Sequence, residues 1–156
     1  PALAFWPGHG GPADAPLEDA LVARHVAALA LPPTVEAAVS SSDRHRVKPW
    51  LAGRVDFAPP VPDLGAQGFT LTGARLERLG PHDAVAVGWR IRNHSIDLFV
   101  WRADAAASIP PSSKRWRGFG MVSWADGGLR YAAISDVDLA DLQRFAAAIS
   151  AASAVR

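Results

Sequence analysis

The sequence contains no cysteine, and this absence excludes disulfide bonds, thiolate metal sites and thiol nucleophiles. It also lacks an apolar run near the ~20 residues that cross a bilayer as a helix. An excess of one charge is missing too, because 16 Lys and Arg oppose 15 Asp and Glu, for a formal net charge of +1. Proteins that bind nucleic acid mainly through phosphates usually carry a larger positive excess, so no nucleic-acid partner is predicted.

What is present fits one compact domain. The chain has 156 residues, of which 49% are hydrophobic and 20% are charged, and this balance excludes a largely disordered chain. Residues 1–16 are rich in glycine and proline, which predicts a tether or an ordered loop. Residues 17–156 are predicted to form a single α+β domain.

Helical spacing of apolar residues appears near both ends of the chain. A first helix is predicted from Asp14 to Pro32, with His25 beside its apolar stripe of Leu17, Leu21, Val22, Val26 and Leu29. A short helix is predicted from Thr34 to Val39. A last helix is predicted to begin near Asp136 or Asp138, and its buried face consists of Leu139, Leu142, Phe145, Ala146 and Ile149.

Between these helices the apolar period changes to two, which predicts strands. The predicted strands are residues 54–57, 69–79, 84–92, 95–101, 118–124 and 129–135. Residues 103–116 are predicted to be an exposed loop. The expected fold is therefore α+β, with an antiparallel meander of about six strands packed with an N-terminal and a C-terminal helix. Phe99 and Trp101 give the sheet a second hydrophobic face, which predicts contact with a partner or a second copy of the chain.

The densest group of functional side chains lies in residues 41–50. A catalytic interpretation takes Ser41 or Ser42 as nucleophile, His45 as base and Asp43 as the group that orients it, but no Gly-x-Ser-x-Gly elbow is present. In a binding interpretation, Arg44, Arg46 and Lys48 bind an anion, and the indole of Trp50 stacks nearby. The third interpretation is a capped turn. The candidate binding residues are Asp43, Arg44, His45, Lys48 and Trp50, with Asp56 as an ion partner.

Two further groups allow more than one interpretation. No two of the five histidines have the close spacing of paired metal ligands, so a metal site would need distant ones such as His25, His45 and His94. The basic and aromatic residues 114–117 either contact phosphates or lipid head groups or belong to a solvated loop.

One long stretch resembles a known family. Residues 41–50 (SSDRHRVKPW) and 53–64 (GRVDFAPPVPDL) look like the signature of the transmembrane anti-sigma factors of proteobacteria. Shorter similar pieces follow in the same order, at residues 67–69, 73–76, 94–101, 118–119 with Trp124, and 133–136. The resemblance spans residues 22–145.

The resemblance implies a regulator without catalytic residues or a cofactor. In that family a cytoplasmic domain sequesters an extracytoplasmic-function sigma factor, one helix crosses the membrane, and a domain similar to this one lies outside. This sequence has neither the sigma-binding helices nor the membrane helix. It is therefore expected to be the periplasmic sensor domain, with residues 1–16 next to the membrane, a periplasmic protein or signal as its partner, and no direct contact with the sigma factor. Two alternatives remain: a periplasmic domain that binds a metal or small ligand, and a hydrolase that uses His45.

Overall fold

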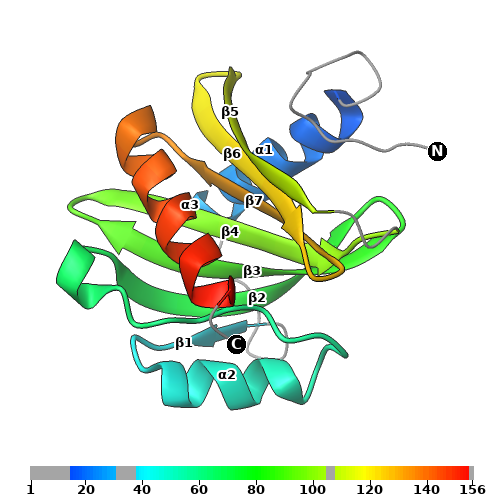
Figure 1. Cartoon of the computed structure of the whole chain (residues 1–156), viewed down its shortest axis with the longest axis vertical. Coiled ribbons are helices and arrows are strands. Elements are labelled where there is room, and N and C mark those ends of the chain that lie inside the picture. The colour runs from blue at the N-terminus through cyan, green and yellow to red at the C-terminus, as the bar shows by residue number, and fades with distance from the viewer. Residues whose placement is uncertain (1–14, 31–37, 105–107, 155–156) are drawn as a thin grey trace.

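The computed structural model describes residues 15–30, 38–104 and 108–154. The elements follow in the order α1 (Ala15–Ala30), β1 (Ala38–Ser40), α2 (Arg44–Ala52), the 3-10 turn η1 (Gly65–Gln67), β2 (Thr70–Leu79), β3 (His82–Ile91), β4 (His94–Arg102), β5 (Ile109–Trp116), β6 (Phe119–Asp126), β7 (Leu129–Ser135) and α3 (Leu139–Ala154). Figure 1 shows one sheet with helices on both sides, so the predicted α+β class is confirmed.

The sheet has seven strands in the order β1-β2-β3-β4-β7-β6-β5, and every neighbouring pair is antiparallel. Strands β1 to β4 form one meander. The chain then crosses to the far edge at β5 and returns through β6 to β7, which pairs with β4. The predicted meander is therefore correct in type, and it is interrupted once between β4 and β5.

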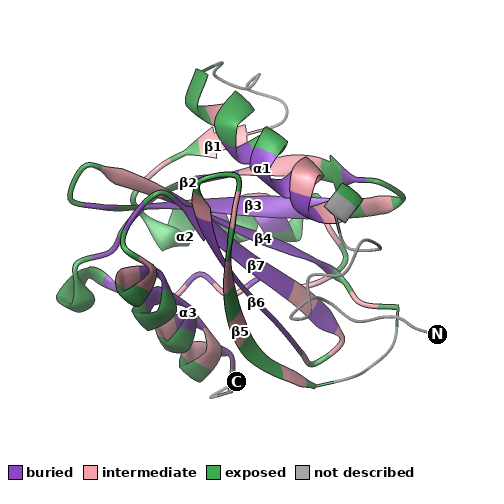
Figure 2. Ribbon diagram, turned by 90° about the horizontal axis from the view of Figure 1, so that it is seen from above, coloured by how far each residue is buried: buried purple, intermediate pink, exposed green. Residues whose placement is uncertain are grey.

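The two faces of the sheet are buried under different helices. Side chains that alternate along the strands separate into two buried clusters, as the period of two predicts. The α3-side core joins Trp89 and Leu98 to Phe145 of α3 and Val47 of α2. The α1-side core, centred on Phe99, is covered by α1, which Figure 2 shows on the opposite side of the sheet from α3. The second hydrophobic face predicted from the sequence is thus largely covered from within the chain.

Three predicted elements are wrong in type. The predicted strand at residues 54–57 is not formed, and the preceding segment is the helix α2, whose Val47 and Leu51 are one turn apart and buried. Within the predicted helix 34–39, residues 34–37 lie outside the described ranges, and Ala38–Ser40 is the strand β1, paired with β2. The predicted loop 103–116 contains β5, an edge strand that tolerates two prolines beside a shift in its pairing with β6.

The apolar stripe predicted along the first helix is buried over only part of its length. Leu21 and Val22 are buried, whereas Val26 and Leu29 are 43% and 59% exposed. The sheet covers only the middle of α1, and the helix extends beyond it (Figure 2). No helix within the described ranges is both long and apolar enough to cross a membrane.

Candidate functional site

Helix α2 is built on a cap that uses one of the predicted site residues. Asp43 precedes the helix, and its Oδ1 accepts a hydrogen bond of 2.9 Å from the backbone N–H of His45. The backbone N–H of Asp43 in turn donates to the hydroxyl of Ser41 at 3.0 Å. These bonds satisfy donors that a helix start leaves free. The interpretation of residues 41–43 as a capped turn therefore agrees with the structure, and Asp43 has a structural role.

His45 and the cations of α2 have no such role. Arg44, His45, Arg46 and Lys48 are all exposed. Their side chains have no hydrogen bond or ion pair with any of the described residues. No acidic residue lies in the first turn of α2. Because a helix N-terminus carries partial positive charge, cations there oppose helix stability. The fold therefore gains nothing from this charge.

Trp50 and Asp56 are placed differently from the prediction. Trp50 is half-buried, with the guanidinium of Arg54 over its ring at 4.2 Å from the centroid. Asp56 pairs with Arg102 of β4 at 3.1 Å, and both side chains are largely exposed. Of the six predicted residues, the structure places Arg44, His45, Lys48 and Trp50 on α2, with Asp43 as the cap of that helix. Asp56 has its ion partner on β4 and not on α2.

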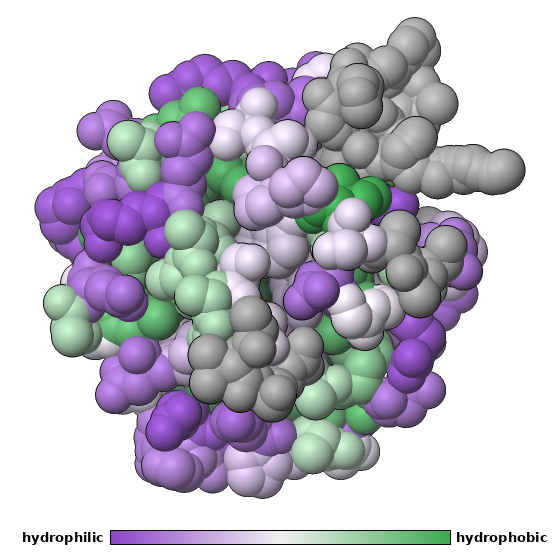
Figure 3. Space-filling view, viewed as in Figure 1, coloured by the Kyte–Doolittle hydropathy of each residue, from purple (hydrophilic) through white to green (hydrophobic). Residues whose placement is uncertain are grey.

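Two pockets lie against α2. The first, of about 310 Å³, is bordered by Arg44 and His45 on the helix and by Asp63 and Leu64 opposite. The second, of about 290 Å³, is bordered by Lys48 on the helix and by residues 57–59 opposite. Figure 3 shows hydrophilic side chains along the lower edge of the molecule, where α2 lies in Figure 1.

The geometry of a serine hydrolase is not formed around His45. Its ring has no hydrogen bond to Ser41, Ser42 or Asp43, since the carboxylate of Asp43 accepts from a backbone N–H instead. The distant histidines do not meet either: His25 bonds to Asp97, and His94 bonds to Asp136. No group of three or more potential metal ligands exists in the described parts of the chain. The prediction of a small-ligand site remains a prediction.

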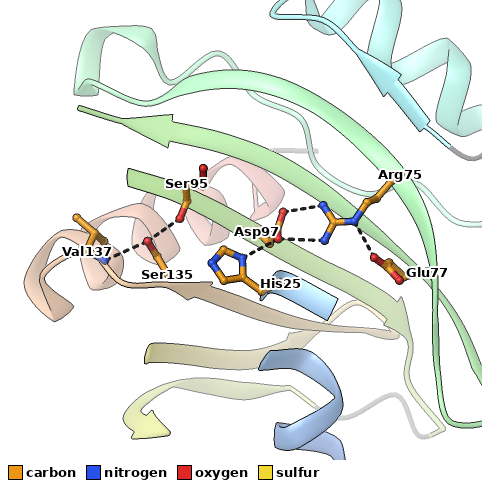
Figure 4. A network of polar contacts seen from close by, with 7 residues as sticks. All are labelled: His25, Arg75, Glu77, Ser95, Asp97, Ser135 and Val137. Atoms are coloured by element: carbon orange, nitrogen blue, oxygen red, sulfur yellow. Dashed lines mark hydrogen bonds and ion pairs between the residues drawn. The ribbon is translucent and has the colours of Figure 1, made fainter. Parts of the chain in front are cut away.

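A buried polar network under α1 was missed by the sequence analysis. Nδ1 of His25 lies 2.7 Å from Oδ2 of Asp97, whose two carboxylate oxygens also accept from Arg75 at 3.0 Å each (Figure 4). The Nε of Arg75 donates to Glu77 at 2.7 Å. His25 is 1% exposed and Asp97 is 6% exposed. One feature of the sequence pointed to this site. The alternation along residues 95–101 places the carboxylate of Asp97 on the same hydrophobic face of the sheet as Phe99.

The charges of this network stabilise one another. Burial by itself raises the pKa of Asp97, but hydrogen bonds from His25 and Arg75 outweigh burial and hold this pKa below its ordinary value of 3.8. Burial by itself lowers the pKa of Arg75, but its bonds to Asp97 and Glu77 outweigh burial and hold this pKa above its ordinary value. Asp97 and Arg75 are therefore both charged at neutral pH, and the network joins α1 to β2 and β4.

A second set of charges joins α1 to the β5–β6 hairpin. The ammonium of Lys114 donates to the fully buried carboxylate of Glu18. Asp19 accepts from Trp116 Nε1 at 2.8 Å and from Arg117 Nε at 2.6 Å. The hydrogen bond from Arg117 lowers the pKa of Asp19 most, and the bond from Trp116 lowers it as well. Of the basic and aromatic residues 114–117, predicted to contact phosphates or to be solvated, Lys114, Trp116 and Arg117 thus hold α1 on the sheet, and Arg115 is exposed.

No protein-family model matches this chain, and no curated protein or solved structure is significantly similar to it. The resemblance to anti-sigma factors therefore rests on the residues of the signature itself.

Proposed function

We propose that the chain is the extracytoplasmic regulatory domain of a membrane-anchored anti-sigma factor, without enzymatic activity. In this proposal a membrane helix and a sigma-binding part belong to the same protein outside the sequence studied. A periplasmic partner or signal acts on the domain, and the sigma factor is contacted only by the cytoplasmic part.

One observation carries the proposal. The two longest pieces of the signature, residues 41–50 and 53–64, cover most of α2 and the segment that returns beside it (Figure 1). Arg44, His45 and Lys48 within it are exposed and form no bond within the described residues. Arg44 also begins the helix, where the dipole disfavours a cation, so fold stability does not explain its charge. Residues placed against stability are expected at interaction sites.

The fold also offers a route by which binding at α2 reaches α1. Helix α2 packs on β1 and β2. Strand β2 carries Arg75 and Glu77, which bond to Asp97 and to Arg24 and thereby hold α1 on the other side of the sheet. In the proposal α1 is the described element nearest to the membrane tether. A partner that shifts α2 would therefore change how firmly α1 is docked.

Substitution of the α2 cations in the full-length protein tests the proposal. The triple change Arg44→Ala, His45→Ala and Lys48→Ala is expected to alter the output of a sigma-dependent reporter. The free energy of unfolding of the domain is expected to change by less than about 0.5 kcal/mol, because all three side chains are exposed.

The matched control is Arg90→Ala with Arg115→Ala, two exposed cations on β3 and β5 that have no partner among the described residues. It is expected to leave the reporter unchanged. Equal output from the wild type and the triple variant, under both inducing and non-inducing conditions, contradicts the proposal.

A further inference from the structure

We infer that the flank of α2 that bears Arg44 and Lys48 binds an acidic peptide segment of a partner protein. The inference deepens the proposed function and rests on it for its biological setting, because it names the chemistry of the partner at the same surface. The binding surface is called the α2 flank below. It consists of the two pockets beside α2, the α2 side chains that border them, and the opposite bank formed by residues 57–65.

The two pockets lie one after the other along the same side of α2. Arg44 borders the first pocket and Lys48 borders the second, and residues four apart lie one above the other on a helix. The opposite bank of both pockets is the segment that returns from α2 toward η1, which Figure 1 shows running beside the helix. A bound chain that follows the helix axis therefore reaches both pockets.

The pockets offer apolar surface to such a chain. The first has Leu71 and Phe69 among its lining residues, and the second has Leu51 and Phe57. The buried indole of Trp89 also borders the first pocket, and its Nε1 has no hydrogen-bond partner in the described structure. Apolar side chains that alternate with acidic ones along an extended peptide match this pattern of pockets and cations.

The charge at the second pocket favours an acidic partner, because Lys48 is the one charged residue among the described residues that line it. Arg44 and Lys48 are exposed and form no ion pair within the described residues. The first pocket is mixed in charge, because Asp43 and Asp63 line it together with Arg44. Each of these carboxylates is held in its own turn by a backbone N–H, at 2.9 Å and 3.0 Å. A carboxylate of the partner beside Arg44 would also offset the unfavourable interaction of this cation with the helix dipole.

The dimensions of the flank set the length of the peptide. Helix α2 has nine residues and is therefore about 13 Å long. An extended chain advances about 3.3 Å per residue, so about four residues lie along the helix. A short linear segment of a partner is enough to cover the flank.

The apolar side chains argue against a lipid surface as the occupant. Proteins that lie on anionic membranes add large exposed apolar groups to their cations. The large hydrophobic residues exposed within the described ranges are Val26 and Leu29, and both are on α1. Because α1 covers the opposite face of the sheet from α3, these residues do not add to the α2 flank.

Selection from random peptides of about ten residues displayed on phage tests the inference. The immobilised chain is expected to enrich sequences in which Asp or Glu alternate with apolar residues. A selected peptide, labelled with a fluorophore, is expected to bind the chain with an affinity that falls as salt is added. Absence of acidic enrichment overturns the inference.

Charge reversal then assigns the site. Arg44→Glu with Lys48→Glu is expected to weaken binding of the selected peptide at least about tenfold. Arg78→Glu with Arg115→Glu changes the net charge equally at exposed positions on β2 and β5 that line neither pocket, and it is expected to preserve binding within about twofold. Equal losses in both variants would show nonspecific attraction and overturn the inference.

A membrane outcome is measured in parallel with vesicles of phosphatidylglycerol and phosphatidylcholine. Binding to these vesicles that depends on Arg44 and Lys48, without selection of acidic peptides, overturns the inference in favour of a lipid surface. None of these measurements uses sigma-factor activity. A peptide site with no effect on the reporter therefore contradicts only the proposed function, and a reporter effect without a peptide site contradicts only the inference.

Discussion

The helix on one side of the sheet, α1, is docked by buried charged and polar side chains as well as by Leu21 and Val22, whereas α3 on the other side is docked mainly by apolar packing. Glu18 and Asp19 of α1 accept hydrogen bonds from Lys114 and Trp116, and His25 bonds to Asp97. Between these bonds, Leu21 and Val22 of α1 pack on the sheet. Helix α3 instead places Phe145 against Phe69 and Trp89, with ring centroids 5.2 Å and 5.7 Å apart. Apolar contacts depend little on pH or salt, whereas ion pairs depend on both. The α1 side is therefore the side whose docking solution conditions can change.

In the proposed function, this difference would allow α1 to be the element that responds to a signal. Buried ion pairs contribute less net stability than apolar groups of the same volume, because the charges must be desolvated. An element held by such pairs can be docked in a defined place and still be released at moderate cost. Helix α3, which completes the larger core, has no comparable set of buried ion pairs in the described structure.

The largest effect is expected from loss of the central carboxylate under α1. Asp97→Ala should lower the free energy of unfolding by about 3–5 kcal/mol at neutral pH, since it leaves His25 and Arg75 buried without their acceptor. The pKa of Asp97 is below its ordinary value of 3.8 in the folded chain. Its contribution is therefore complete above about pH 3.8 and is lost as the pH falls through the folded pKa. Urea unfolding at neutral and acidic pH measures this dependence.

The control on the opposite side is Phe145→Ala, which should cost about 3–5 kcal/mol by leaving a cavity. This cost is expected to be similar at about pH 7 and about pH 3, because no titrating group is removed. If the cost of Asp97→Ala also stays constant as the pH falls, charge does not distinguish the two sides of the sheet.

A smaller effect is expected at the second ion pair of α1. Lys114→Met should destabilise the chain by about 1.5–3 kcal/mol, because the fully buried Glu18 loses its charged donor. The double variant Glu18→Leu with Lys114→Met should recover most of this loss, since an apolar pair of similar shape needs no desolvated charge. Thermal unfolding of the two single variants and the double variant measures the coupling. Additive losses would show that the pair does not act as a unit.

The smallest effect is expected at α2, and its sign is opposite. Arg44→Glu should stabilise the chain by about 0.3–1 kcal/mol at low ionic strength, because it places an anion at the positive end of the helix dipole. The gain should shrink as salt is added. The thermal midpoint at low and high salt measures both effects. A loss of stability would show that Arg44 has a structural contact, contrary to its exposed and unpaired position.

The parts of the fold that were predicted correctly depend on local pattern. The alternation from Val85 to Ile91 and from Ile96 to Trp101 predicted the β3–β4 hairpin, and the register of that hairpin confirms it. The turn at Gly127 and Gly128 similarly joins β6 to β7, as its residues predicted, since both glycines have positive φ. These signals are sufficient because each hairpin is closed by residues near one another in sequence.

The wrong elements depend on contacts that are distant in sequence. Pro110 and Pro111 disfavour a strand, and only the edge position of β5 makes them acceptable there. Pro49 likewise disfavours a helix at the position of α2, although Asp43 is a good cap and Val47 and Leu51 have helical spacing. Burial of this apolar pair against the sheet compensates for the proline, and the sequence does not show which face is covered.

The sequence by itself determined the α+β class, the two hairpins and the clustering of Asp43, Arg44, His45 and Lys48, because each follows from the spacing of neighbouring residues. Only the tertiary structure decided which charges have partners. His25 and Asp97 are 72 positions apart, and they bond because α1 crosses the face of β4. The cations of α2 remain free because the fold brings no described carboxylate within bonding distance of them. Pairing depends on position in space, which local spacing does not define.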